Sequence, residues 1–134
     1  MKILVTGAKG FIGKNLICEL KNRGFTEIFE YDLDTDPSLI DSYCRDAGFV
    51  FHLAGVNRPK NQEEFLKGNY GFTRELLDTL KKHGNKCPVM VSSSTQAALD
   101  NPYGKSKKAA EEILFDYSRE TGNKVFVYRF PNVF

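Results

Sequence analysis

The chain of 134 residues is long enough to bury about two thirds of the surface that its unfolded form would expose, which suffices for one domain. Hydrophobic residues make up 41% and charged residues 27% of the sequence, proportions that exclude a disordered chain. The net charge of +2 favours no particular partner, and the scattered lysines and arginines lack the interleaved aromatic residues of a nucleic-acid groove.

Cysteine content and hydropathy indicate the cellular compartment in which the protein is expected. Cys18, Cys44 and Cys87 are odd in number and far apart, without a Cys-x-x-Cys pair. This spacing favours free thiols in a reducing compartment over disulfides or metal ligands. No apolar run reaches the roughly 18 residues of a membrane span, and the layout of a signal peptide is missing. We therefore expect a cytoplasmic protein that binds no metal, no membrane and no nucleic acid.

The first predicted elements are a strand, a glycine turn and a helix. Residues 2–6 form an aliphatic run that predicts a strand, and Gly7, Gly10 and Gly13 follow at regular spacing. Apolar residues at helical spacing come next, and Gly24 predicts the end of the helix. Glycines let the backbone approach a pyrophosphate, and the helix N-terminus directs N–H groups and a positive dipole end at it. The sequence predicts a dinucleotide-binding loop; the alternative is a glycine turn between a core strand and a core helix.

A second strand is predicted at residues 27–31, and it ends at an acidic stretch that begins with Asp32. Asp32 follows Gly13 by about 20 residues, the offset at which a carboxylate accepts hydrogen bonds from the adenosine ribose. A carboxylate there favours NAD because it repels the extra phosphate of NADP, although Lys9 in the glycine loop offsets part of that repulsion. The alternative is a solvated acidic turn before a short helix at residues 37–46.

The continuous apolar run at residues 49–55 predicts a strand that is buried on both faces. His52 lies within it, and we favour a core histidine with satisfied hydrogen bonds over a catalytic base. Ala54 and Gly55, at the carboxyl end, are small enough for a cofactor to lie against the backbone. Arg58 follows in a loop at the expected ligand-binding rim, where it pairs either with a substrate phosphate or with a surface carboxylate.

The remaining elements alternate helix and strand. Helical periodicity extends over residues 61–83, and Gly68 predicts a break within it. A fourth strand, predicted at residues 88–94, ends in serines. A long helix at about 101–121 and a fifth strand at 124–129 complete the chain. Strands that alternate with helices through short connections predict a parallel sheet with helices on both faces.

Tyr103 and Lys107 form the second chemical pattern. Residues four apart on a helix share one face, so the phenol and the ammonium group face the same side. A phenol has a pKa near 10, and a nearby cation favours the phenolate, which makes the tyrosine useful as an acid or base. Ser94, at the end of the fourth strand, is placed to hydrogen-bond a substrate oxygen. Taken alone, a Tyr–Lys pair at this spacing is more often a feature of a helix surface.

Short motifs occur in a characteristic order along the chain. They are Thr-Gly-Ala-Lys-Gly-Phe-Ile-Gly at residues 6–13, His-Leu-Ala-Gly at 52–55, Asn69, Ser-Ser-Ser at 92–94, Tyr103 with Lys107, and Arg-Phe-Pro-Asn-Val at 129–133. They resemble the motifs of extended short-chain dehydrogenase/reductases that act on nucleotide sugars, the NAD-dependent epimerase/dehydratase family. The resemblance covers the whole chain and implies a Rossmann-type three-layer α/β sandwich with a parallel five-stranded sheet. The segment between the second and third strands is too short for the strand and helix that many members insert, so we expect strand order 2-1-3-4-5.

The resemblance also implies roles for individual residues. Tyr103 would donate a proton to a sugar ketone, and Lys107 would lower the pKa of Tyr103 and hold the nicotinamide ribose. Ser94 would polarise the ketone, and Asn69 would support the site. The cofactor would contact Gly7, Lys9, Gly10, Phe11, Ile12, Gly13, Asp32, Leu53, Ala54, Gly55, Tyr103 and Lys107. The substrate would contact Asn57, Arg58 and Asn132.

Within the family, the motifs at residues 52–59 and 101–104 look most like those of reductases of capsular-polysaccharide synthesis. Such enzymes reduce the 4-keto group of a UDP-linked 6-deoxy amino sugar and carry a metal-binding cupin domain after the reductase. The resemblance thus implies an NAD(P)H-dependent ketosugar reductase of capsule or surface polysaccharide synthesis. It favours NADPH whereas Asp32 favours NADH, so the sequence leaves the choice between NAD and NADP open.

Two other functions are compatible with the same residues. A nucleotide-sugar epimerase or 4,6-dehydratase would use the same tyrosine and lysine, although dehydratases usually have an Asp-Glu pair where Thr95 and Gln96 stand. A dinucleotide-binding module without turnover is the third possibility. Its best support is that residues 1–134, taken as one Rossmann domain, stop where family members begin their substrate-binding region.

The resemblance finally implies a homodimer. Related enzymes pack two long helices from each subunit into a four-helix bundle, and the corresponding helices here are around residues 69–82 and 102–121.

Overall fold

The computed structural model describes residues 1–32, 34–53, 71–94 and 102–130, with only the backbone described at 93–94, 102–107 and 129–130. Its strands are β1 (Ile3–Thr6), β2 (Ile28–Tyr31), β3 (Phe49–His52), β4 (Val89–Ser94) and β5 (Val125–Phe130). Its helices are α1 (Phe11–Asn22), α2 (Leu39–Asp46), α4 (Phe72–Lys82) and α5 (Pro102–Thr121).

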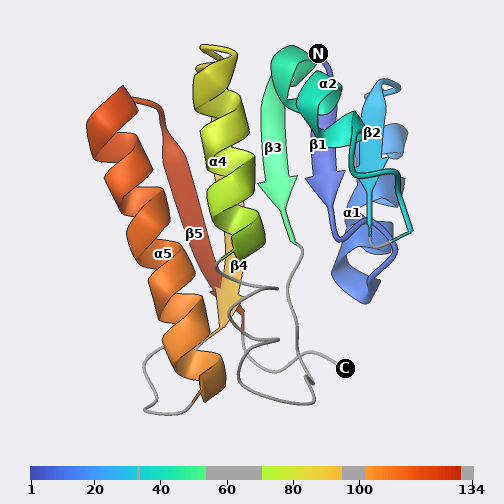
Figure 1. The fold of residues 1–134 in the computed structure, drawn as a ribbon. Helices are drawn as coiled ribbons and strands as arrows, with labels where there is room; N and C mark the ends of the chain where they lie inside the picture. The colour runs from blue at the N-terminus through green and yellow to red at the C-terminus, as the bar shows by residue number, and fades with distance from the viewer. Residues whose placement is uncertain (33, 54–70, 95–101, 131–134) are drawn as a thin grey trace.

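The five described strands form one parallel sheet in the order β2-β1-β3-β4-β5, which confirms the predicted Rossmann-type topology. The central strand β1 pairs with β2 and β3, so Ile3 lies opposite both Ile28 and Phe49. Every residue of β1 is buried, as expected for a strand that is covered on both faces. Figure 1 shows α2, α4 and α5 together on one face of the sheet.

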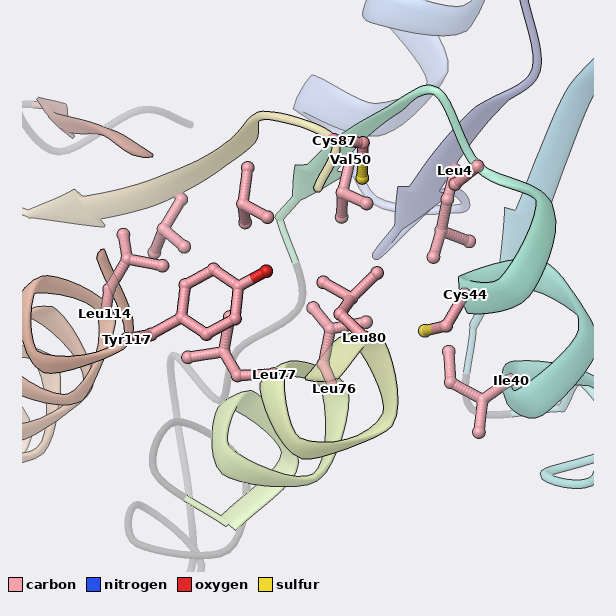
Figure 2. Close-up of a cluster of buried hydrophobic side chains, with 13 residues drawn as sticks. Leu4, Ile40, Cys44, Val50, Leu76, Leu77, Leu80, Cys87, Leu114 and Tyr117 are labelled. Carbon is pink, nitrogen blue, oxygen red and sulfur yellow. The ribbon is translucent and has the colours of Figure 1, made fainter. Parts of the chain in front are cut away.

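Alternate residues of each strand point to opposite faces and divide the core in two. On one face, Leu4 and Val50 join side chains of α2, α4 and α5, including Leu76 and Leu114, and all four are fully buried (Figure 2). On the other face, Ile3, Val5 and Ala8 pack with Ile17 and Leu20 of α1. The amphipathic helices that the sequence predicts therefore sandwich the sheet.

The helix ends follow the predicted glycines. Gly24, Gly84 and Gly122 each have a positive φ angle just after a helix. The predicted helix at residues 37–46 begins later, at Leu39, because Asp36 accepts hydrogen bonds from the backbone and the hydroxyl of Ser38 and closes a turn first. The first part of the helix predicted at residues 61–83, with its break near Gly68, lies outside the described residues.

Candidate functional site

The segments that bear several of the predicted site residues meet at the carboxyl edge of the sheet in the described part of the chain. The arrowheads of the strands point to one edge in Figure 1, and both α4 and α5 begin there. The glycine loop leaves β1 at this edge, Ser94 is the last residue of β4, and Tyr103 is the second residue of α5. Ligands of open α/β sheets bind outside the carboxyl ends of the strands.

The glycine loop is shaped by two close constraints. Gly7 has a φ angle of 69°, which L side chains rarely adopt, and its carbonyl oxygen accepts the N–H of Gly10 at 3.1 Å. A Cβ atom on Gly13 would lie 2.3 Å from the Gly7 oxygen, so only glycine lets α1 pack against the loop. Among the residues that the structure describes, no side chain caps the N-terminus of α1 at Gly10. The first turn of α1 therefore presents its backbone N–H groups and the positive end of the helix dipole, which fit a dinucleotide pyrophosphate.

The acidic end of β2 is tied to this loop. Asp32 accepts a hydrogen bond from the backbone N–H of Lys9, with 2.8 Å between the nitrogen and Oδ2. The Lys9 ammonium group pairs with the Asp34 carboxylate, and this contact raises the pKa of Lys9 and lowers the pKa of Asp34. Asp34 was expected only as a member of the acidic stretch after β2, and its pairing with Lys9 was not predicted.

His52 is a core histidine, as predicted. Its side chain is 1% exposed, its Nδ1 atom lies 2.7 Å from the Thr6 hydroxyl, and its Nε2 atom lies 2.9 Å from the Thr73 hydroxyl. Both threonines are also buried. The two ring nitrogens are thus engaged inside the protein, and the catalytic-base interpretation is not supported. Sequence reasoning missed Thr73, because nothing local marks it as a partner of a residue in β3.

The other predicted cofactor-binding residues in the described ranges lie at the end of β3 and the start of α1. The N–H of Leu53 donates to the Thr6 carbonyl oxygen at 3.2 Å, and Leu53 packs against the core cluster beside α1. Phe11 is the first residue of α1 and is 66% exposed, whereas Ile12 beside it is half-buried. The arrangement leaves a large aromatic side chain exposed next to the predicted pyrophosphate loop.

Several predicted site residues fall outside this description. The side chains of Ser94, Tyr103 and Lys107 are not described, and only their backbone is placed in β4 and α5. The predicted residues outside the described ranges altogether are Ala54, Gly55, Asn57, Arg58, Asn69 and Asn132. Within the described ranges, no cluster of three or more metal-binding side chains occurs. No helix of those ranges is long and apolar enough to cross a membrane.

The parallel sheet and its glycine loop define a dinucleotide-binding fold, and the sequence comparison identifies its family. Residues 3–134 match the model of the NAD dependent epimerase/dehydratase family, so the chain belongs to that family of extended short-chain dehydrogenase/reductase enzymes. The family expected from the motifs is confirmed.

Some relatives match this chain over its whole length. The chain is 43% identical over 134 residues to the UDP-2-acetamido-2,6-beta-L-arabino-hexul-4-ose reductase of Pseudomonas aeruginosa, of which it covers 36%. It is 45% identical to the crystallised capsular polysaccharide assembling protein CapF of Staphylococcus aureus, with a TM-score of 0.86, and covers 36% of that protein. The chain thus spans just over a third of these relatives, both of which agree with the expected resemblance to capsular-polysaccharide reductases.

Solved structures of relatives contain either form of the cofactor. MoeE5, in complex with UDP-glucose and NAD, is 25% identical; the match covers 95% of this chain and 52% of MoeE5, with a TM-score of 0.78. RMD of Pseudomonas aeruginosa, complexed with NADPH, is 27% identical; the match covers 98% of this chain and 55% of RMD, with a TM-score of 0.77. Homologues therefore bind NAD or NADPH, and nucleotide sugars.

Proposed function

We propose that this chain is the cofactor-binding and catalytic part of an NAD(P)H-dependent reductase. Its substrate would be a nucleotide-linked 4-keto-6-deoxy sugar used in capsule or surface polysaccharide synthesis. The observation that carries the proposal is that β4 and α5, which bear Ser94, Tyr103 and Lys107, meet the same sheet edge as the glycine loop. The 43% identity to the Pseudomonas reductase supports the choice of substrate class.

Each of the three catalytic candidates has a distinct role in this proposal. Ser94 donates a hydrogen bond to the ketone oxygen and polarises the carbonyl group. Tyr103 donates its phenolic proton to that oxygen, so the ketone becomes a hydroxyl group. Lys107 places a cation beside the phenol, which favours the phenolate left behind, and holds the nicotinamide ribose. The nicotinamide, when bound, supplies the hydride.

The remaining candidate residues bind the substrate or the cofactor, or support the catalytic residues. Asn69 supports the catalytic group, and Asn57, Arg58 and Asn132 contact the nucleotide sugar in this proposal. The glycine loop holds the pyrophosphate, and Leu53, Ala54 and Gly55 line the cofactor at the end of β3.

Reduction of a UDP-linked 4-keto-6-deoxy amino sugar by this chain tests the function. The consumption of NADH or NADPH is followed for the wild type, for Tyr103→Phe and for the matched control Tyr128→Phe. Tyr128 is a half-exposed residue of β5. We expect Tyr103→Phe to lower the rate by about a hundredfold or more, because it removes the proton donor, and the control to keep it. Full activity of Tyr103→Phe would contradict the assigned role.

The same experiment separates the two alternatives. A product that differs from the substrate only in configuration, with no net consumption of reduced cofactor, would indicate an epimerase. Cofactor binding without any turnover in the presence of ketosugar would indicate a non-catalytic dinucleotide-binding module.

For the cofactor, the proposal is NADH in preference to NADPH. Asp32 lies against the glycine loop through the Lys9 N–H, and the Lys9 ammonium is neutralised by Asp34. A 2′-phosphate would therefore meet the Asp32 and Asp34 carboxylates, and the Lys9 cation beside them is already paired. Because like charges repel, this arrangement disfavours NADPH.

Calorimetric titration with NADH and NADPH tests this preference. Asp34→Asn frees the Lys9 ammonium, so we expect the affinity for NADPH relative to NADH to rise about threefold. Asp36→Asn is the control, because Asp36 bonds Ser38 rather than Lys9. Tighter binding of NADPH by the wild type would overturn the preference and make Lys9 the governing residue.

A further inference from the structure

Three segments that meet at the site are linked through one buried imidazole. The Thr6 hydroxyl, the His52 ring and the Thr73 hydroxyl form a continuous chain of hydrogen bonds of 2.7 and 2.9 Å. These residues belong to the ends of β1 and β3 and to the first turn of α4. All three side chains are at most 1% exposed. A buried polar chain of this kind fixes its members in one arrangement, because lost hydrogen bonds are not replaced by water.

The chemistry of the three groups suits this linkage. A neutral imidazole donates through one ring nitrogen and accepts through the other, and a threonine hydroxyl does either by rotation. The imidazole ring also packs against Phe72, the neighbour of Thr73 in α4. The two rings meet edge-on, with 5.3 Å between their centroids. Two consecutive residues of α4 therefore contact the same imidazole.

The linkage ends next to the glycine loop. Thr6 directly precedes Gly7, and its carbonyl oxygen accepts the N–H of Leu53 at 3.2 Å. Two consecutive residues at the end of β3 thus hydrogen-bond to Thr6: His52 to its side chain and Leu53 to its backbone. A shift of α4 or of β3 would be transmitted to the residue from which the loop starts.

We propose that His52 is a positioning residue, which sets the glycine loop for the cofactor by joining the ends of β1 and β3 to the start of α4. The proposal rests on the proposed function, since it assumes that the loop binds a nicotinamide dinucleotide. It assigns no catalytic step to the imidazole, which is enclosed in the core.

The test removes one hydroxyl and leaves the imidazole in place. Thr73→Val keeps the shape of the side chain but not its hydrogen bond, and Thr73→Ser restores the hydroxyl. The matched control is Tyr117→Phe, which removes the buried hydrogen bond of 2.7 Å from Asn123 near the opposite edge of the sheet. Two properties are measured in folded protein: the affinity for NADH and NADPH by calorimetry, and the backbone amide chemical shifts of Gly7 and Gly10 without cofactor.

We expect Thr73→Val to shift the two glycine amides and to weaken cofactor binding about fivefold. Thr73→Ser should restore both properties, and Tyr117→Phe should lower the melting temperature without changing either. A purely structural role predicts that Thr73→Val behaves like Tyr117→Phe, and that result would overturn the proposal.

Failure of the proposed function gives a different result. If the wild type binds neither NADH nor NADPH, the dinucleotide proposal fails, and the glycine amide shifts alone decide whether His52 positions the loop. Unchanged shifts in Thr73→Val would then reject the positioning role as well.

Discussion

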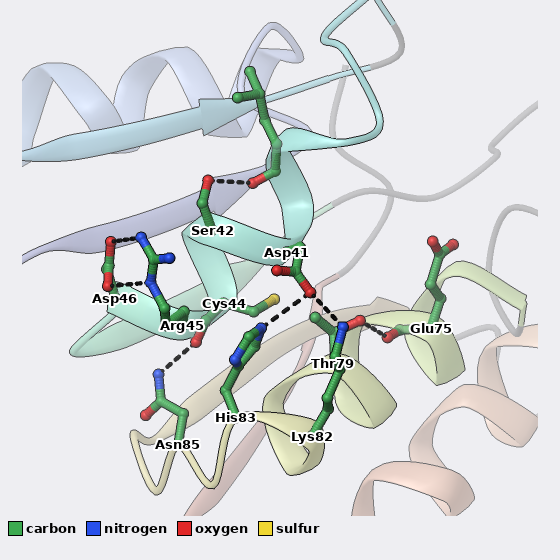
Figure 3. Close-up of polar contacts among 11 residues, drawn as sticks. Asp41, Ser42, Cys44, Arg45, Asp46, Glu75, Thr79, Lys82, His83 and Asn85 are labelled. Carbon is green, nitrogen blue, oxygen red and sulfur yellow. Dashed lines mark hydrogen bonds and ion pairs between the residues drawn. The ribbon is translucent and has the colours of Figure 1, made fainter.

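Asn85 is a residue whose importance lies in contacts far away in the sequence. Its side-chain nitrogen donates to the carbonyl oxygen of Cys44 at 2.7 Å (Figure 3). The same nitrogen donates to the carbonyl oxygen of Ala47 at 2.8 Å, and the Oδ1 atom accepts the N–H of Cys87. Asn85→Asp replaces two donated hydrogen bonds by repulsion between oxygens, so we expect a loss of about 2 kcal/mol in the free energy of unfolding. Urea denaturation measures it, and Asn15→Asp, which alters one exposed helical contact, should change it by under about 0.5 kcal/mol.

Asp41 gives the stability a dependence on pH. It accepts hydrogen bonds from Lys82 and from His83, each at 3.0 Å, and these contacts between α2 and α4 lower its pKa in the folded protein (Figure 3). Because the folded pKa is below the unfolded value of about 3.9, the stabilisation is fully present above that value and is lost as the pH falls toward the folded pKa.

The variant Asp41→Asn should therefore flatten the acidic limb of the stability curve. Denaturant midpoints measured as the pH is lowered from about 6 to 3 would show this change. Asp46→Asn is the control: its pKa is also lowered, but by the adjacent Arg45, which stays close in the unfolded chain. An equal effect of the two substitutions would contradict the role of the contact between α2 and α4.

At the scale of elements, two glycines of the loop have different roles: we expect Gly13 to be required for packing and Gly10 for cofactor binding. A Cβ atom on Gly13 would overlap the Gly7 oxygen at 2.3 Å, whereas one on Gly10 would lie 3.4 Å from it, in ordinary contact. Gly10 also has φ −72° and ψ 171°, which alanine adopts freely. We expect Gly13→Ala to lower the melting temperature and Gly10→Ala to keep it.

Cofactor binding distinguishes the two variants further. Gly10→Ala leaves a fold that is intact but whose loop carries a methyl group toward the pyrophosphate, so the affinity for NADH should fall about tenfold. Calorimetry of both variants checks this, with thermal unfolding as the measure of folding. Wild-type affinity in Gly10→Ala would show that the backbone at this position does not approach the cofactor.

The sequence predicts well those helices and strands whose formation depends on neighbouring residues in the chain. Periodicity and glycine stops predicted the ends of α1, α4 and α5 near Gly24, Gly84 and Gly122, and the alternation of strands and helices predicted the parallel sheet. Burial of a polar residue within a core strand likewise predicted the satisfied state of His52. Its partners were not predictable, because Thr6 and Thr73 meet it only after the chain has folded.

In the candidate site, too, features with local sequence causes were predicted and contacts between distant residues were not. The spacing of glycines and the position of Asp32 indicated a dinucleotide loop, and the family match agrees with that interpretation. The pairing of Lys9 with Asp34 was missed, since sequence places several carboxylates near the loop and does not say which one the ammonium reaches. This choice decides the charge that a 2′-phosphate would meet.

At the scale of the whole molecule, α4 and α5 lie side by side on one face of the sheet, where the resemblance implies a subunit contact (Figure 1). Between them is a groove whose lining includes Leu77 and Ile113 among charged residues. Lys81 bridges the two helices, pairing with Asp78 of α4 at 3.6 Å and with Glu120 of α5 at 3.3 Å. Ion pairs exposed to this extent contribute little in isolation, so an interface here needs apolar contacts as well.

Phe115 offers such a contact, because it is a large apolar side chain that is 45% exposed on α5. We predict a homodimer through α4 and α5, and expect Phe115→Lys to convert it to a monomer by placing a charge in an apolar contact. Sedimentation equilibrium at micromolar concentration measures this, with Tyr128→Lys on β5 as a control that keeps the dimer. A wild-type chain that sediments as a monomer would reject the interface, and a dimer broken only by Tyr128→Lys would move it to the β5 side of the sheet.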